Sequence, residues 1–177
     1  MSKLILLNGF AGVGKSTIAK MYAADKALTM SIEADKVMDM FGDWRCCTDE
    51  AINLRLKHII AMIKTHLTTG HDVILPYLVR DESEVQIFAD LAKESGSTFY
   101  EILLFTTEEE AISRLLERGL WGEEGSRKLT EDDIPTMKSL YDLMMSETDK
   151  RPNTIKVEVE KGDISGTYQR LLKVLTA

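Results

Sequence analysis

The stretch Gly9-Phe10-Ala11-Gly12-Val13-Gly14-Lys15-Ser16 decides how the rest of the chain is interpreted. It fits the pattern G-x-x-x-x-G-K-[ST], which is typical of the phosphate-binding loop called the P-loop. An apolar run at residues 3–8 precedes it, and a helix-compatible run at residues 15–24 follows it. The stretch therefore has the strand–loop–helix setting that the motif requires.

Each residue type in this loop has a physical task. The glycines allow the backbone to turn its N–H groups toward an anion, and the next helix adds its positive N-terminal end. Lys15 supplies a charge for the β- and γ-phosphates, and the Ser16 hydroxyl suits Mg²⁺. We expect ATP and Mg²⁺ as cofactors, with Ser16 as the metal ligand. The nucleotide-binding residues expected here are Gly9, Ala11, Gly12, Val13, Gly14, Lys15, Ser16 and Thr17.

Composition narrows the class of protein. The 177 residues predict a single domain spanning 1–177, and 22 basic against 29 acidic residues give a net charge of −7. This charge argues against broad binding to nucleic acid or to acidic membranes. Cys46 and Cys47 are adjacent, which fits neither a disulfide framework nor a metal-ligand spacing. With no apolar run of membrane-spanning length, we expect a cytoplasmic protein with reduced thiols. The alternative for Cys46 and Cys47 is a redox pair.

Short apolar runs alternate with helical patterns along the chain. Strands are predicted over residues 3–8, 28–32, 72–77, 98–105 and 154–159. Helices are predicted over residues 15–24, 37–41, 49–69, 82–95, 107–118 and 130–146, and from 163 or 165 to 175, with a loop over 42–45. This alternation predicts an α/β fold: a three-layer, doubly wound, parallel five-stranded sheet of the P-loop NTPase type.

An acidic pair follows the second predicted strand. Because ligands of open α/β sheets bind beyond the carboxyl ends of the strands, Glu33 and Asp35 should lie beside the P-loop. Asp35 could accept the proton of a hydroxyl group or orient that group in line for phosphoryl transfer. Glu33 could hold water on the magnesium. The alternative is a solvated acidic turn in which Asp35 caps the next helix.

Two arginines supply a second candidate group. Arg114 and Arg118 are four residues apart, and they therefore share one helix face. They could surround the transferred phosphoryl group with positive charge. Arg118 leads into the polar segment 119–130, which carries Arg127 and could close over nucleotide as a short lid. The alternative is that these are solvated arginines paired with nearby glutamates.

The acceptor pocket is expected between residues 36–60 and the segment after the third strand. Aromatic rings there offer flat apolar surfaces, and arginines could hold an anion. The expected lining residues, with Asp35, are Trp44, Arg45, Arg55, Tyr77 and Arg80. The alternative for each of these five is a packing or surface role.

Taken together, the P-loop, the acidic pair, the R-x-x-x-R pattern before a polar loop and the chain length resemble small P-loop kinases. This group includes shikimate and gluconate kinases, chloramphenicol phosphotransferase and the kinase domain of polynucleotide kinases. The resemblance implies that Asp35 contacts the acceptor hydroxyl and that Arg114 and Arg118 face ATP. It also implies that the segment around Asp163 borders the adenine. The catalytic residues implied are Lys15, Asp35 and Arg118.

One departure from P-loop proteins concerns the third strand. Many of them carry an aspartate at its end to support the metal, whereas the run Val73-Ile74-Leu75-Pro76-Tyr77 contains no acid. The nearest acid is Asp81. Either Glu33, Asp35 or water supports the metal, or catalysis is weak or lost.

The sequence thus predicts an ATP-dependent phosphotransferase that acts on a hydroxyl of a small molecule, such as a metabolite, sugar acid or antibiotic. No guanine-binding signature N-K-x-D occurs, which favours ATP over GTP. Two alternatives stay open: a nucleoside, nucleotide or polynucleotide-end kinase, and a nucleotide-binding regulatory protein with weak or no turnover. A small-molecule acceptor is the expected partner, nucleic acid is not expected, and the chain should be a monomer or homodimer.

Overall fold

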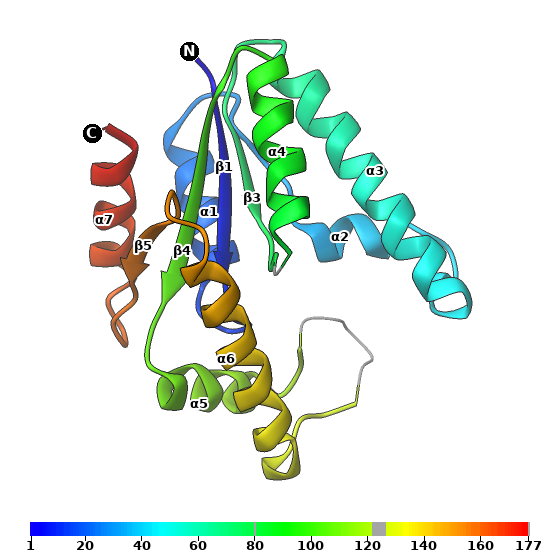
Figure 1. The fold of residues 1–177 in the computed structure, drawn as a ribbon, viewed down its shortest axis with the longest axis vertical. Coiled ribbons are helices and arrows are strands. Elements are labelled where there is room, and N and C mark those ends of the chain that lie inside the picture. The colour runs from blue at the N-terminus through cyan, green and yellow to red at the C-terminus, as the bar shows by residue number, and fades with distance from the viewer. Residues whose placement is uncertain (80, 122–126, 177) are drawn as a thin grey trace.

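The computed structural model describes residues 1–79, 81–121 and 127–176, and within them the strands form one sheet. Every pair of neighbouring strands is parallel, and the order across the sheet is β2-β3-β1-β4-β5 (Figure 1). The strands are β1 (Lys3–Gly9), β2 (Met30–Ser31), β3 (Val73–Pro76), β4 (Thr98–Phe105) and β5 (Ile155–Glu158). This confirms the predicted five-stranded parallel sheet.

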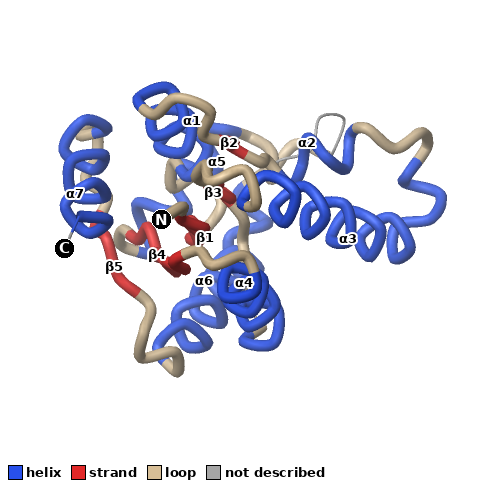
Figure 2. The backbone as a smooth tube through the Cα atoms, turned by 90° about the horizontal axis from the view of Figure 1, so that it is seen from above, coloured by secondary structure: helices blue, strands red, loops and turns tan. Residues whose placement is uncertain are grey.

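Helices cover both faces of the sheet. Figure 2 shows α1 and α7 on one side of it and α3, α4 and α6 on the other, which confirms three layers. The helices are α1 (Lys15–Asp25), α2 (Ala34–Asp39), α3 (Thr48–Leu67), α4 (Glu82–Glu94), α5 (Glu108–Arg118), α6 (Ile134–Asp149) and α7 (Ile164–Thr176). Two short 3₁₀ helices, η1 (Trp44–Cys47) and η2 (Glu131–Asp133), precede α3 and α6. None of the helices within the described ranges is long and apolar enough to cross a membrane.

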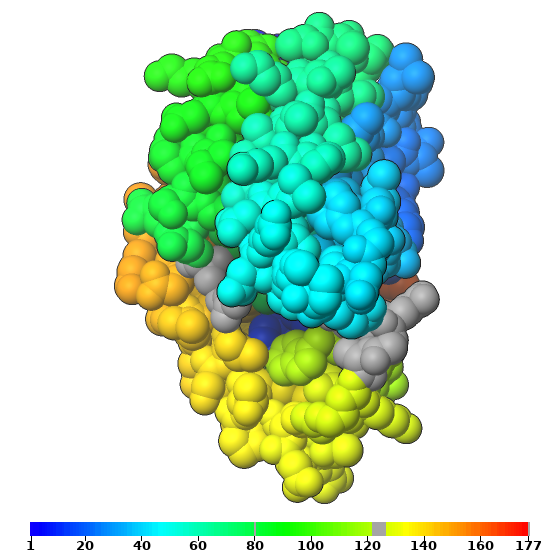
Figure 3. All heavy atoms as spheres, turned by 90° about the vertical axis from the view of Figure 1, so that its right-hand side faces the viewer, coloured from blue at the N-terminus to red at the C-terminus, as the bar shows by residue number. Residues whose placement is uncertain are grey.

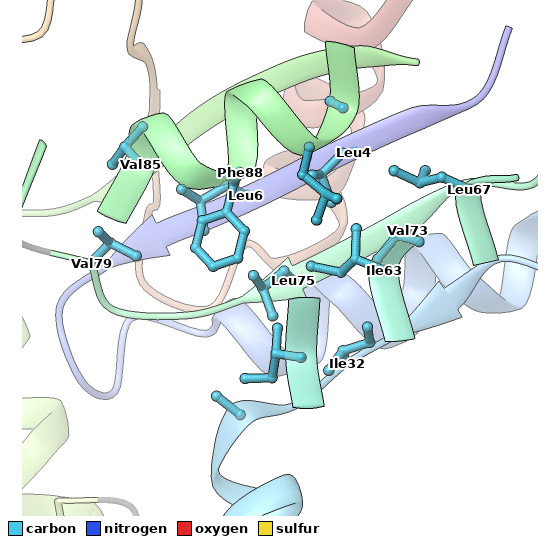
Figure 4. Close-up of a cluster of buried hydrophobic side chains, with 14 of the residues drawn as sticks. Leu4, Leu6, Ile32, Ile63, Leu67, Val73, Leu75, Val79, Val85 and Phe88 are labelled. Carbon is cyan, nitrogen blue, oxygen red and sulfur yellow. The ribbon is translucent and has the colours of Figure 1, made fainter. Parts of the chain in front are cut away.

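The central strand β1 is buried on both faces, as its unbroken apolar sequence predicts. Leu4 and Leu6 pack with α3 and α4, where Ile63 and Phe88 close the layer (Figure 4). Ile5 and Leu7 point to the other side, into the cluster under α1 and α7. Successive side chains alternate between the two cores because the strand has a period of two residues. This packing fixes the end of β1, from which the P-loop begins.

Three local predictions differ from the structure. The strand expected over 28–32 is reduced to Met30–Ser31, because Leu28 has a positive φ of 60° and Thr29 N donates to Lys26 O in a turn. Helix α2 begins at Ala34 instead of residue 37. Part of the predicted loop over 42–45 belongs to the 3₁₀ helix η1.

Candidate active site

The P-loop connects the carboxyl end of β1 to the first turn of α1. Gly9, Gly12 and Gly14 all have positive φ, and Gly14 directly precedes the helix with φ of 101°. A Cβ at Gly9 would lie 2.4 Å from the Leu104 carbonyl oxygen, so β4 approaches too closely for any side chain there. These positions show why the motif needs glycine. Gly12 and Gly14 require it for their positive φ, and Gly9 requires it both for its positive φ and for the close approach of β4.

Lys15 folds back over this loop. Its Nζ donates to Gly9 O at 2.6 Å and to Phe10 O at 2.9 Å. Burial lowers the pKa of Lys15 to about 8; the Asp35 carboxylate acts in the opposite direction, and the Arg118 guanidinium lowers it further. The charges of Asp35 and Arg118 therefore both act on Lys15, and the catalytic roles of these three residues stay predictions.

Asn8, which sequence reasoning missed, connects the P-loop to the segment after β3. Its side chain is fully buried. Its Oδ1 accepts from Gly9 N at 2.8 Å and from Val79 N at 3.1 Å, and its Nδ2 donates to Val79 O at 2.8 Å. The sequence signal was a polar residue at the end of an apolar strand, where an unpaired amide would be costly.

Phe10, inside the P-loop, makes aromatic contacts that the motif does not predict. Its ring packs edge-on against Trp121 at 6.1 Å and against Tyr141 at 5.5 Å between centroids. Tyr141 is in turn tied to the end of β4, since its hydroxyl donates to Thr106 O at 2.5 Å. The variable positions of the motif thus join the loop to the α5–α6 region.

A cavity of about 240 Å³ lies beside the P-loop and α1. Arg114 lines it, with Nε donating to Glu110 Oε1 at 2.7 Å, while its buried Nη2 has no hydrogen-bond partner among the described residues. The cavity has the backbone-rich, partly apolar lining that suits a nucleotide base and sugar. Its residues are Gly12, Val13, Gly14, Thr17, Ile18, Arg114, Val159, Glu160, Gly162, Ile164 and Thr167.

Asp163 does not line the cavity that its two neighbours in the chain line. Gly162 and Ile164 line the cavity, whereas the Asp163 carboxylate accepts from Gly166 N at 2.8 Å and pairs with Arg170 at 3.3 Å. The Asp163 side chain thus stabilises the start of α7. Its predicted part in nucleotide binding stays a prediction.

The predicted lid, residues 119–130, is anchored at both ends. Leu129 is buried, and its N–H donates to Gly119 O at 2.8 Å. Arg127 forms an ion pair with Asp133, so it belongs to the start of η2. Residues 122–126 lie outside the described residues, and closure of the segment stays a prediction.

On the acceptor side, Asp35, Arg55 and Tyr77 come together. Arg55 Nη1 lies 4.0 Å from Asp35 Oδ1, and Arg55 Nη2 donates to the Tyr77 hydroxyl at 3.0 Å. The Arg55 side chain is 14% exposed and Asp35 is 59% exposed. Burial raises the pKa of Tyr77 to about 12, so its hydroxyl stays protonated near neutrality. Glu33 instead pairs with Lys20 of α1 at 3.0 Å.

Two other predicted lining residues lie in η1. Trp44 is buried with Met38 and Ala51, between α2 and α3. The Arg45 guanidinium lies 4.4 Å from the centre of the Trp44 ring. The structure therefore gives Trp44 a packing contact, and its contact with an acceptor stays a prediction. Arg80 lies outside the described residues.

Figure 3 shows the surface hollowed between the cyan spheres of α3 and the yellow-green spheres of α5 and the segment after it. Dark blue atoms from the N-terminal part of the chain are visible at the bottom of this hollow. The α3 side and the α5 side thus border one depression, with the N-terminal part of the chain at its floor.

The candidate metal ligand near the P-loop suits Mg²⁺, which needs few ligands from the protein, better than a metal that is coordinated by protein side chains alone. Among the described residues there is no group of three or more His, Cys, Asp or Glu side chains that could hold a metal ion. Mg²⁺ commonly keeps several waters and takes one or two protein ligands together with phosphate oxygens. Ser16, in the first turn of α1, offers such an oxygen, and Asp35, which is 59% exposed, is a carboxylate on the acceptor side.

The comparisons with known proteins agree with this geometry. Residues 4–144 match the family described as an AAA domain, and the chain belongs to this family. A P-loop domain of this kind implies nucleotide binding, and the fold is P-loop kinase-like. No curated protein sequence matches the chain significantly.

Solved structures share the whole fold at low sequence identity. A candidate kinase from Chloroflexus aurantiacus j-10-fl has a TM-score of 0.70 and 16% identity, covering 99% of this chain and 96% of its own. The Deinococcus radiodurans tunicamycin resistance protein has a TM-score of 0.61 and 16% identity, with coverages of 98% and 96%. A gluconokinase from Sinorhizobium meliloti 1021 has a TM-score of 0.59 and 16% identity, with coverages of 98% and 95%. These likenesses show the P-loop kinase-like fold.

Proposed function

We propose that this protein transfers the γ-phosphoryl group of ATP to a hydroxyl group of a small molecule. The observation that carries the proposal is the P-loop, in which Lys15 Nζ donates to Gly9 O and Phe10 O and the pKa of Lys15 responds to the charges of Asp35 and Arg118. Phosphoryl transfer needs a phosphate cradle, positive charge around the moving group and a carboxylate that orients the acceptor. These three residues, together with the P-loop backbone, supply those parts.

The donor half of the reaction belongs to the P-loop. Its backbone N–H groups and Lys15 hold the phosphates, and the cavity lined by Arg114 and Gly162 holds the rest of the nucleotide. Mg²⁺, held by Ser16 and the phosphates, would neutralise charge on the β- and γ-phosphates. Arg118, exposed at the end of α5, contributes positive charge on the open side.

The acceptor half belongs to α2 and α3. Asp35 receives the hydroxyl proton or holds the hydroxyl in line with the γ-phosphate. Arg55 lies beside it and is held by Tyr77, so an acceptor with an anionic group next to the reacting hydroxyl fits this corner. Metabolites, sugar acids and antibiotics are the acceptor classes to test; the gluconokinase and tunicamycin resistance structures share the fold and motivate the last two.

A second candidate is a nucleotide-binding protein with weak or no turnover. Strand β3 ends at Pro76 without an acid, and Tyr77 then turns its hydroxyl to Arg55. Glu33 is paired with Lys20. Metal support therefore rests on fewer carboxylates than in many P-loop proteins, which favours this candidate if no acceptor is found.

The deciding experiment is a panel of metabolites, sugar acids, nucleosides and antibiotics incubated with γ-labelled ATP and Mg²⁺. We expect label on one class of hydroxyl acceptor with the wild-type protein and none with Lys15→Ala. Lys20→Ala, which changes an exposed lysine on the same helix, should keep both ATP binding and transfer. If the wild-type protein binds ATP and labels nothing in a broad panel, the second candidate replaces the first.

A further inference from the structure

The adjacent cysteines in η1 form a close pair that the proposed reaction does not use. Cys46 Sγ and Cys47 Sγ are 3.1 Å apart, and both residues are exposed. A pair of thiols this close and this accessible can react in sequence with one disulfide molecule, because the second thiol is already next to the first. The pair is therefore chemically distinct from two separate surface cysteines.

The position of the pair connects it to the acceptor side. η1 joins α2, which carries Asp35, to α3, which carries Arg55. Cys47 immediately precedes α3, with φ of −138° and ψ of 48°. On the other side of Cys46, Trp44 is buried with Met38 of α2 and Ala51 of α3. A backbone change at the two cysteines therefore acts directly on the contact between the two helices.

Closing a disulfide between neighbouring residues requires such a change. Adjacent Cα atoms are about 3.8 Å apart across a trans peptide, below the roughly 4.4–6.8 Å usual for disulfides. The bond also needs the sulfur atoms at about 2.05 Å. The peptide between Cys46 and Cys47 must turn for the ring to close. Cys46 N donates to Asp43 O at 3.1 Å, and Asp43 has a positive φ of 41°. The backbone of η1 therefore cannot turn at Cys46 without breaking this hydrogen bond or changing the conformation of Asp43.

We propose that Cys46 and Cys47 are an oxidative modification site: a dithiol whose disulfide displaces Trp44 and separates α2 from α3. This separation would disable acceptor binding, a consequence that rests on the function proposed above. The nucleotide side does not share these contacts, since Lys15 and the cavity beside α1 are formed by other elements.

The chemistry balances with a low-molecular-weight disulfide as the oxidant. The Cys46 thiolate attacks one sulfur atom, forming a mixed disulfide and releasing one thiol. The Cys47 thiolate then attacks the Cys46 sulfur and releases the second thiol. Two protein thiols are oxidised by two electrons, and the small disulfide is reduced to two thiols. A dithiol reductant reverses the reaction, as expected of transient disulfides in reducing compartments.

The first test uses glutathione disulfide and mass spectrometry on the full chain. We expect the wild-type protein to lose the mass of two hydrogen atoms, to resist alkylation at both cysteines, and to recover with dithiothreitol. Cys46→Ser and Cys47→Ser, each with one thiol left, should instead keep a glutathione adduct. A stable adduct or an intermolecular dimer in the wild type would overturn the proposal.

The second test locates the structural effect by hydrogen exchange, which needs no acceptor. Oxidation should make amides of residues 34–56 exchange roughly tenfold faster, while those of residues 9–25 keep their rates. The double variant Cys46→Ser/Cys47→Ser treated identically is the matched control and should not respond. In a Trp121→Phe background, the fluorescence of Trp44 should shift to longer wavelength. An internal disulfide with unchanged exchange at 34–56 would refute the displacement of Trp44, whether or not the protein is a kinase.

Discussion

The donor side and the acceptor side of this molecule are built in different ways. The P-loop follows a seven-residue strand buried at the sheet centre and leads into an eleven-residue helix. The acceptor side follows a two-residue strand at the sheet edge and uses a six-residue helix. Lys15 is held by two carbonyl groups, whereas Asp35 is 59% exposed. The donor side is therefore built on long, buried elements, and the acceptor side on short elements and a few side chains.

This difference explains why the phosphate-binding site has a recognisable sequence motif and the acceptor-binding site has none. A phosphate is bound largely by backbone N–H groups, and the backbone conformation needs glycine at fixed spacings. An acceptor is bound by side chains from α2, α3 and the segment after β3, which many residue combinations can form. The comparison predicts that changes on the donor side alter folding or nucleotide binding, and changes on the acceptor side alter transfer alone.

The largest effect is expected from Asp35→Asn, which removes the proposed proton acceptor. Turnover on an identified acceptor should fall by about 10²–10⁴-fold, the usual contribution of a general base. ATP affinity, measured by calorimetry, should stay within a few-fold of wild type. Asp39→Asn, on the same helix and paired only at the surface with Lys36, is the control. Near-full turnover in Asp35→Asn would remove Asp35 from the mechanism.

Gly9→Ala tests the tight packing of the donor side. Its Cβ would meet Leu104 O at 2.4 Å and would sit on a backbone with φ of 146°, so we expect a loss of roughly 2–4 kcal/mol in the free energy of unfolding. Gly14→Ala has φ of 101° but open space for a Cβ, and it should cost only roughly 1–2 kcal/mol. Denaturant unfolding compares the two, and equal losses would contradict the role of Leu104.

The third prediction concerns the pH dependence of ATP binding. Lys15 has a pKa of about 8, and bound phosphates raise it because they favour the charged ammonium. Binding therefore takes up a proton above pH 8, and affinity should fall as pH rises, by at most about tenfold per pH unit. Calorimetry in buffers with different ionisation enthalpies detects this uptake. Lys15→Arg, which stays charged, should bind without it; uptake that persists would come from another group.

The smallest effect is expected from Tyr77→Phe. It removes the hydroxyl that accepts from Arg55 at 3.0 Å but keeps the ring under the guanidinium. We expect about 1 kcal/mol, or roughly fivefold, in the acceptor KM, with ATP affinity unchanged. Tyr100→Phe, on the opposite face of the sheet, serves as the control and should leave the acceptor KM alone. A change in ATP affinity in Tyr77→Phe would weaken the division into two sides.

Sequence patterns predicted the sheet, its parallel direction and the P-loop, because these depend on apolar runs and on glycine. They were less successful at the edge, where the turn at Leu28 shortens β2. They also did not reveal that Glu33 would pair with Lys20, because this pairing depends on side chains brought together by folding. Asp163 was one of the two residues predicted to begin the last helix, and its carboxylate accepts from Gly166 N there. Asp35 was predicted as a site residue because its place after a strand follows from topology, and its role stays a prediction.

The Asn8 amide also has a consequence for the base of the phosphate loop. It uses both its oxygen and its nitrogen, on Gly9 and on the two polar backbone groups of Val79. An aspartate would lack the donor and a leucine would lack both groups, so neither keeps this three-bond joint. The strand end that starts the phosphate loop is therefore bonded through one side chain to the segment after β3. The base of the phosphate loop thus depends on a residue that lies outside the G-x-x-x-x-G-K-[ST] motif.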